Sequence, residues 1–214
     1  MGIIKNVKNR VMRSSRTKKL EHFFSLAREG NSVLDVGVSR ESELALPARN
    51  FFLKNYRFPP ESYTGLGIQD LSGMSTLFPR KRFVEYDGGD FPFGDNEFDW
   101  VFSNAVIEHV GDDDAQLHFL NEMLRVARRV FFTTPNKYFP VESHTNVILM
   151  HWVDPVFYSW CERNGTNYDR ESLRLLTRKK LENLICRSQA RDYQIVCNRV
   201  ATIPLTFTVV CRSG

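Results

Sequence analysis

The stretch FDWVFSNAVIEHV, Phe98 to Val110, begins as an apolar strand and ends in a run of polar residues. The apolar half, Phe98 to Ser103, favours burial on both faces, which is typical of a central strand in a parallel sheet. A helix is expected next, from Asp112 to Arg128, because apolar residues recur there at helical spacing behind three aspartates that suit the positive end of a helix dipole. The order strand, turn, helix indicates one unit of an alternating α/β chain.

The same alternation continues in both directions along the chain. Further helices are expected at Thr17–Glu29, Glu41–Tyr56 and Thr177–Arg187. Further strands are expected at Ser32–Gly37, Tyr63–Ile68, Arg82–Tyr86, Val130–Thr134, Tyr193–Asn198 and Phe207–Arg212. Strands separated by helices predict a three-layer α/β fold with a mostly parallel sheet of seven strands and an antiparallel C-terminal pair at its edge. Ligands of such sheets bind outside the carboxyl ends of the strands.

Charge divides the chain into a short arm and one domain. Residues 1–20 hold seven basic residues and no acidic one, so the rest of the chain carries about −3 against +4 for the whole. We expect a basic N-terminal arm at 1–20 and one domain at 21–214, with an insertion on the substrate side at about 135–170. Basic residues confined to an arm argue against a nucleic-acid enzyme.

The arm has two interpretations. Ile3, Ile4, Val7 and Val11 recur at helical spacing among basic residues, a pattern that also fits an amphipathic helix lying on an anionic membrane. The other interpretation is a first helix that packs on its own domain. The chain shows no apolar run long enough for a spanning helix and no secretory signal, so a cytoplasmic location is expected, with peripheral membrane contact left open.

Asp35 and Gly37 close the expected strand Ser32–Gly37. A glycine at this position lets the backbone approach a ligand closely. The pattern GxGxxG is absent, because Val38 and Ser39 follow the single glycine, so a tight structural turn is predicted equally well.

Four segments together resemble a known family. They are VLDVG at 33–37, FVEYDGGDFPF at 83–93, FDWVFSNAVIEHV at 98–110 and LRVARRVFFTTPN at 124–136. The chain is similar to the class I S-adenosylmethionine-dependent methyltransferases and, more narrowly, to their small type 11 group. The resemblance covers residues 32 to about 151 and implies a Rossmann-like fold with S-adenosylmethionine as cofactor.

The resemblance also implies roles for individual residues. Asp35 and Gly37 would line the amino-acid end of the cofactor, and Asp87, with the Gly88 backbone, would face adenine. Asn104, between Ser103 and Ala105, would close the fourth strand beneath the sulfonium. Glu108 and His109 would begin the substrate side.

The chain departs from the family pattern at two places. Two further glycines that usually follow Gly37 are absent. The acidic residue that usually closes the second strand and binds both ribose hydroxyls is replaced by Gly67. Asp70 or Gln69 is then the candidate for the ribose.

Methyl transfer needs alignment and exclusion of water rather than a covalent nucleophile. If the acceptor is a hydroxyl group, a base must take its proton, and histidine suits that role. His109 is the first candidate and His144 the second, with Glu142 placed to orient a ring or to bind a polar substrate. The expected acceptor is a small molecule or a glycan-linked or lipid-linked precursor.

Other classes fit less well. No metal is expected, because neither the histidine spacing nor the carboxylates match a known ligand pattern. A nicotinamide-dependent oxidoreductase would need the missing GxGxxG. The remaining alternative is a non-catalytic domain that kept the fold and acts through a membrane or a partner.

Overall fold

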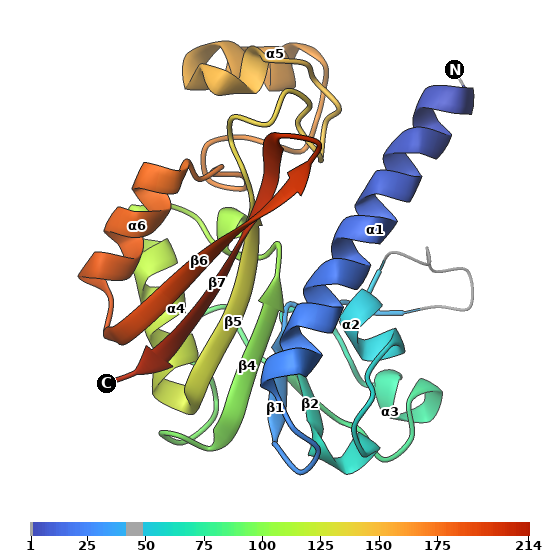
Figure 1. Cartoon of the computed structure of the whole chain (residues 1–214), viewed down its shortest axis with the longest axis vertical. Coiled ribbons are helices and arrows are strands. Elements are labelled where there is room, and N and C mark those ends of the chain that lie inside the picture. Colours follow the sequence, from blue (N-terminus) through green and yellow to red (C-terminus); the bar gives the residue numbers. More distant parts are fainter. Residues whose placement is uncertain (1, 42–48) are drawn as a thin grey trace.

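The computed structural model describes residues 2–41 and 49–214, and side chains from residue 10 onward within those ranges. At its centre is a seven-stranded sheet in the order β3-β2-β1-β4-β5-β7-β6. The strands are β1 (Val33–Val36), β2 (Tyr63–Gly67), β3 (Arg82–Glu85), β4 (Phe98–Asn104), β5 (Ala127–Pro135), β6 (Ala190–Val200) and β7 (Ile203–Ser213). The first five strands pair in parallel, and β7 runs antiparallel to both β5 and β6. The expected sheet with an antiparallel C-terminal edge is confirmed (Figure 1).

Helices cover both faces of this sheet, which gives the expected three layers (Figure 1). They are α1 (Gly2–Leu26), α2 (Phe51–Lys54), α3 (Met74–Leu77), α4 (Asp113–Val126), α5 (Asp154–Arg163) and α6 (Arg178–Arg187). On one face α4 and α6 pack on a core that includes Leu34 and Val101. On the other face α1, α2 and α3 pack on a core that includes Val33 and Trp100. Neighbouring strand residues point to opposite faces, so strands covered on both sides, such as β4, are largely apolar.

The junction between α4 and β5 differs from the prediction. The expected helix Asp112–Arg128 ends at Val126, and β5 begins at the next residue. Ala127 already has an extended backbone, with φ −141° and ψ 150°, and it pairs with Phe98 of β4. The predicted end of the helix at Arg128 is therefore two residues too late, because no turn residue separates the helix from the strand.

The first helix is also longer than expected. It begins at Gly2 rather than at Thr17, so the predicted arm continues into α1 without a break. The buried residues Leu20 and Phe23 fix its C-terminal half to the domain, and the Phe23 ring makes an edge contact with Trp100 of β4. The helix expected at Glu41–Tyr56 lies partly outside the described residues, and α2 occupies its described end.

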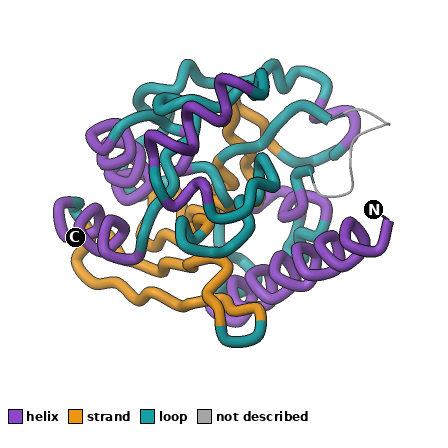
Figure 2. Tube along the Cα trace, turned by 90° about the horizontal axis from the view of Figure 1, so that it is seen from above, coloured by secondary structure: helices purple, strands orange, loops and turns teal. Residues whose placement is uncertain are grey.

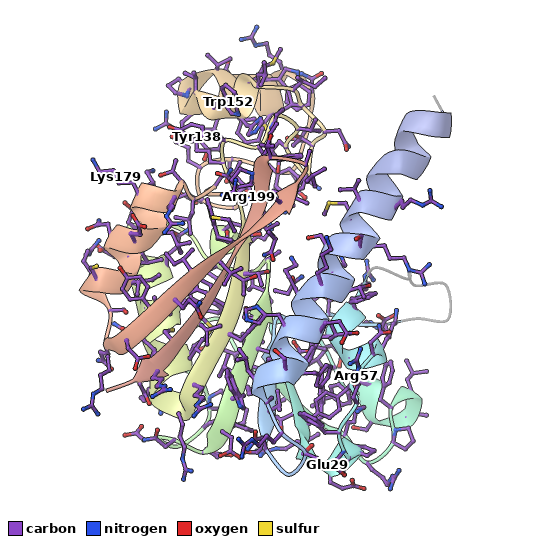
Figure 3. The ribbon with its side chains drawn as sticks, viewed as in Figure 1. Glu29, Arg57, Tyr138, Trp152, Lys179 and Arg199 are labelled. Carbon is purple, nitrogen blue, oxygen red and sulfur yellow. The ribbon has the colours of Figure 1, made fainter. Side chains whose placement is uncertain are left out.

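The segment between β5 and α6 lies over the end of the sheet at which β4 and β5 terminate (Figures 1 and 2). It contains a 3-10 turn at Met150–Trp152 and helix α5. A small core of its own holds it together, made of Val147, Phe157, Cys161, Leu173 and Leu175. Figure 3 shows Tyr138 and Trp152 in this segment, and their ring centroids lie 6.0 Å apart. The segment is placed to form a wall over the ligand-binding end of the sheet.

Among the described residues, no helix combines the length and the apolar character that a membrane-spanning segment needs.

Candidate functional site

The carboxyl ends of β1 and β4 open into a cavity of about 160 Å³. Three of the predicted residues line it, namely Asp35 and Gly37 from β1 and Asn104 from β4. Arg16 and Lys19 of α1 line the same cavity. The structure therefore brings the residues at the ends of two strands together with two basic side chains that sequence reasoning had assigned to the arm.

Asp35 is a buried carboxylate, with 7% of its surface exposed. Its Oδ2 accepts a hydrogen bond of 2.6 Å from the Tyr63 hydroxyl on β2. Burial raises the pKa of Asp35 to about 7, although the Tyr63 hydrogen bond and the positive charge of Lys81 act in the opposite direction. Among the described residues the Tyr63 hydroxyl is its side-chain partner, and Asp35 also lines the cavity, so its carboxylate is suited to bind a cation there.

Lys19 is a buried basic residue that lines the same cavity, with 5% of its surface exposed. Its Nζ donates a hydrogen bond of 3.4 Å to Thr133 Oγ1 of β5. Burial lowers the pKa of Lys19 to about 8, against the opposing effect of the Glu108 charge. The signal for this residue was present in the sequence, because Lys19 lies four positions before the buried Phe23 and so on the same face of the helix.

Two of the three glycines named from the sequence, Gly37 and Gly67, lie where close packing leaves no room for a side chain. Gly37 has φ +99°, and a Cβ at this position would lie 2.3 Å from Cγ2 of Val106. At Gly67 a Cβ would lie 2.0 Å from the backbone oxygen of Val38. The N–H groups of Gly37 and Val38 both donate to the Leu66 carbonyl oxygen. The chain leaving β1 thus crosses the carboxyl end of β2 and fills the space that a side chain at position 67 would occupy.

Asp70 and Gln69 lie just beyond β2 and contact the same crossing segment. Asp70 is exposed, and its carboxylate lies 4.0 Å from the Arg40 guanidinium. Hydrogen bonds from Ser72 lower the pKa of Asp70. Gln69 Oε1 accepts a hydrogen bond from the Arg40 backbone N–H. Neither residue lines the cavity at Asp35.

Asp87 and Gly88 form an exposed turn after β3. Asp87 Oδ1 accepts a hydrogen bond of 2.9 Å from the Gly89 N–H. Gly88 has φ +95°, and no atom lies within 4 Å of the place where its Cβ would be. The pair remains outside the cavity at Asp35, so the structure leaves the adenine side of the predicted site open to solvent.

A second cavity, also of about 160 Å³, adjoins the first. It shares Arg16, Lys19 and Asn104 with the first cavity, and Glu142 and His144 line its other side. The two cavities therefore join the predicted cofactor side to the predicted substrate side.

His109 and His144 are in direct contact. Their Nε2 atoms lie 3.1 Å apart. Nδ1 of His109 lies 2.9 Å from the Ser172 carbonyl oxygen, and Nδ1 of His144 lies 2.6 Å from Glu142 Oε1. The two histidines proposed from the sequence as alternatives thus form one cluster between the loops that follow β4 and β5.

Glu142 holds the loop that carries His144. Its carboxylate accepts hydrogen bonds from the backbone N–H groups of His144 and Thr145 and from the Thr145 hydroxyl. Burial opposes the ionisation of Glu142, but the hydrogen bond and charge of His144 and these backbone donors outweigh it and lower the pKa to about 2. Glu142 is therefore an anion that orients the His144 ring.

Glu108 lies fully buried beside the two histidines. Its Oε2 accepts a hydrogen bond of 3.1 Å from the Thr134 hydroxyl. Its Oε1 has no hydrogen-bond partner among the described residues. Burial raises the pKa of Glu108, against the opposing effects of His109 and His144.

The chain is similar to known proteins in its fold and, over its central segment, in its sequence. A family model described as a methyltransferase domain, of the type 11 group, matches residues 67–130. No curated protein matches the chain. Solved structures do match it, at identities that establish the fold alone.

Three of these structures illustrate the similarity. A methyltransferase from Methanosarcina mazei described as S-adenosylmethionine-dependent has 15% identity and a TM-score of 0.58, covering 87% of this chain and 94% of that one. A possible histamine N-methyltransferase from Thermotoga maritima has 12% identity and a TM-score of 0.60, covering 98% and 96%. The 1,6-didemethyltoxoflavin-N1-methyltransferase of Burkholderia thailandensis, solved with that substrate and S-adenosylhomocysteine, has 18% identity and a TM-score of 0.57, covering 95% and 78%.

The matched segment begins at the end of β2 and ends inside β5. It contains two of the four segments that carry the sequence resemblance, 83–93 and 98–110, and the first half of a third, 124–136. The strand order and the antiparallel edge supply the fold. Together they confirm the resemblance: the chain has the Rossmann-like fold of the class I S-adenosylmethionine-dependent methyltransferases, and its central segment matches their type 11 group.

Proposed function

We propose that the chain binds S-adenosylmethionine at the mouth of β1 and β4 and transfers its methyl group to an acceptor in the adjoining cavity. The observation that carries this proposal is the pair of buried, opposite charges in one cavity, Asp35 and Lys19. Each charge is costly to bury without a partner of opposite sign. The ammonium and carboxylate groups of an amino acid would supply both partners at once.

The donor set of the cavity fits the amino-acid end of the cofactor. Asp35 would accept from the ammonium group, while Lys19 and Arg16 would bind the carboxylate. Gly37 would keep the first strand end free of a side chain, and Asn104 would face the sulfonium. When bound, the cofactor supplies a methyl group on a cationic sulfur, so the protein need only align the acceptor and exclude water.

The residues proposed to bind the ribose and adenine of the cofactor are less preorganised than those at its amino-acid end. Gly67 offers only its backbone to the ribose. Asp70 and Gln69 now contact Arg40 in the loop after β1. They would bind the ribose only after these contacts with Arg40 are released. Asp87 and the Gly88 backbone would face adenine, where a carboxylate accepts a hydrogen bond from the exocyclic amine.

Removing the adenine contact tests this half of the site. Asp87→Ala is expected to weaken binding of S-adenosylhomocysteine about 10- to 100-fold, the cost of one hydrogen bond to a charged group. Asp90→Ala removes the same charge from the same turn and serves as the control, since Asp90 contacts His118 on the surface. Isothermal titration measures both. If both variants lose the same affinity for S-adenosylhomocysteine, the effect comes from the charge of the turn, and the proposed adenine contact of Asp87 is wrong.

The acceptor is proposed to be a hydroxyl group of a small molecule or of a glycan-linked or lipid-linked precursor. The cluster of His109, His144 and Glu142 supports this choice, because a hydroxyl must lose its proton and an imidazole oriented by a carboxylate is suited to take it. Two of the structural neighbours described above carry names of N-methyltransferases, so nitrogen is the competing acceptor atom. Methylation of oxygen is expected to be lost on replacement of the histidines.

Contact with an anionic membrane is proposed for the predicted arm at 1–20, in a protein that otherwise stays in the cytoplasm. Arg10, Arg13 and Lys18 are exposed on α1, where they are available to lipid headgroups. We expect the chain to sediment with vesicles that contain anionic lipid and to remain in the supernatant with neutral vesicles. Charge reversal at these three residues removes the attraction. Equal sedimentation with both kinds of vesicle would contradict an electrostatic contact.

The alternative function is a non-catalytic domain that acts through a membrane or a partner. The backbone of Val38 in the place of the ribose-binding acid favours it. Binding of S-adenosylmethionine distinguishes the two functions, because a domain that has lost the cofactor has no reason to keep opposite buried charges in one cavity.

A further inference from the structure

The contact between His109 and His144 is unusual in its hydrogen-bond roles. Nδ1 of His109 faces a backbone carbonyl oxygen, which can only accept. Nδ1 of His144 faces a Glu142 oxygen at 2.6 Å, in a carboxylate already surrounded by N–H and O–H donors. Each Nδ1 is therefore the protonated nitrogen of its ring.

It follows that the two Nε2 atoms, 3.1 Å apart, present lone pairs to each other when both rings are neutral. Two lone pairs at this distance repel. The contact becomes favourable when a positive species lies between the rings, either an additional proton or a metal cation.

The surroundings of Glu108 favour a metal cation over an additional proton between the two rings. One ligand atom from each of Glu108, His109 and His144 lies within 4.8 Å of the others. The Glu108 carboxylate is completely buried, and its Oε1 lacks a hydrogen-bond partner among the described residues. A proton shared by the imidazoles leaves that oxygen unpaired, whereas a cation bound by all three groups satisfies it.

We propose that Glu108, His109 and His144 bind a divalent transition-metal cation, for which Zn²⁺ is the best match. Two imidazoles and a carboxylate are a common ligand set for zinc, which keeps an open fourth position in catalytic sites. Zinc to nitrogen bonds of about 2.0–2.1 Å in a tetrahedron place two ligand nitrogens about 3.3 Å apart, close to the observed separation.

The groups around the three ligands match those of a metal site. A ligating histidine nearly always donates its second N–H to a carbonyl oxygen or a carboxylate. Ser172 O fills this role for His109 and Glu142 for His144, and the Thr134 hydroxyl holds the second oxygen of Glu108. Each ligand is thus oriented before a cation arrives.

The site borders the second cavity, which His144 and Glu142 line. The inference deepens the proposed function and rests on it. An acceptor hydroxyl in the open coordination position would have its pKa lowered by the cation and would release its proton to solvent water, with the imidazoles acting as ligands rather than as the base. The oxygen would then bond to the methyl carbon, and the sulfur would leave as the neutral thioether. The inference departs from the expectation of no metal. Glu108 and His109 are adjacent, and the third ligand is 35 residues away, so no spacing pattern marked the site.

Titration of the metal-free, tag-free protein with Co²⁺ and Zn²⁺, in the absence of S-adenosylmethionine, tests the proposal. We expect a single equivalent of Co²⁺ to give the intense visible absorption of a tetrahedral site, and Zn²⁺ to displace it with a dissociation constant of about 1 μM or tighter. Zn²⁺ is also expected to raise the unfolding temperature of the wild-type protein, and a chelator to reverse this shift.

Three variants assign the binding to these residues. Glu108→Gln, which keeps the shape and the acceptor for Thr134, and His144→Ala are each expected to weaken Zn²⁺ binding at least about 10-fold. His118→Ala removes a surface histidine and should leave binding unchanged. Absence of the Co²⁺ absorption and of Zn²⁺ binding in the wild-type protein would overturn the proposal, as would binding that survives in His144→Ala. Because no cofactor is present, either failure leaves the proposal of S-adenosylmethionine binding untouched.

Discussion

Asp35→Asn is expected to stabilise the free protein and, in the same molecule, to weaken binding of S-adenosylmethionine about 10- to 100-fold. Asparagine keeps an acceptor for the Tyr63 hydroxyl but removes a carboxylate that is buried in the unliganded protein. A pKa raised from 3.8 to about 7 corresponds to a cost of about 4 kcal/mol at pH 8. The loss of affinity follows because the ammonium group loses its counter-charge.

The effect of Asp35→Asn on stability should depend on pH. Asp35 keeps its proton in the folded state up to about pH 7, while in the unfolded state it ionises near its ordinary pKa of 3.8. The wild-type protein therefore loses stability as the pH rises between these values, and the difference from Asp35→Asn is fully present above the higher one. Urea unfolding at pH 4 and pH 8 measures this difference, which is small at the lower pH.

A matched substitution separates the site from general charge effects. Asp192 is exposed on β6 and pairs with Arg212, so Asp192→Asn should change neither stability nor affinity. Equal stability of the wild-type protein and Asp35→Asn at pH 8, together with unchanged affinity, would show that Asp35 is neither strained by burial nor in contact with the cofactor.

Gly67→Asp is expected to unfold the protein or to destabilise it by about 3 kcal/mol or more, although it introduces an acid where the sequence resemblance implies one. The new Cβ would lie 2.0 Å from the Val38 backbone oxygen. The backbone that carries this oxygen cannot move aside cheaply, because the N–H groups of Gly37 and Val38 both donate to the Leu66 carbonyl oxygen. Thermal unfolding followed by circular dichroism measures the loss.

Gly73→Asp is the control for this substitution. No atom lies within 4 Å of the place where a Cβ at Gly73 would be, and its φ of −79° suits any residue. This variant should retain the wild-type unfolding temperature. If Gly67→Asp instead folds normally and binds the cofactor more tightly, the crossing segment at Val38 moves readily, and the acid position still serves the ribose.

Much of the sheet was predictable because the buried strands β1, β2 and β4 are short, largely apolar runs bounded by polar or small residues. The strand expected at Arg82–Tyr86 is found at Arg82–Glu85, and the antiparallel pair at the C-terminus is confirmed. Boundaries without a turn residue were not predictable, as at Val126 and Ala127, where helix passes directly into strand.

The candidate site could be predicted only in part. The alternation of strands and helices brought Asp35 and Asn104 together, since both end parallel strands that are neighbours in the sheet. Lys19 was missed because its charge was grouped with the arm, although its helical face is the buried one. The contact of His109 with His144 depends on how two loops meet in space, which sequence spacing does not encode.

Isothermal titration of the wild-type protein with S-adenosylhomocysteine tests the proposed cofactor site, because this ligand carries the same amino-acid end as the methyl donor. We predict a single site with a dissociation constant in the micromolar range, lost when Lys19 is replaced by methionine, which keeps most of the apolar stem but has no charge to bind the carboxylate. If the wild-type protein does not bind the ligand at millimolar concentration, or if Lys19→Met binds it equally well, Asp35 and Lys19 do not form a cofactor site.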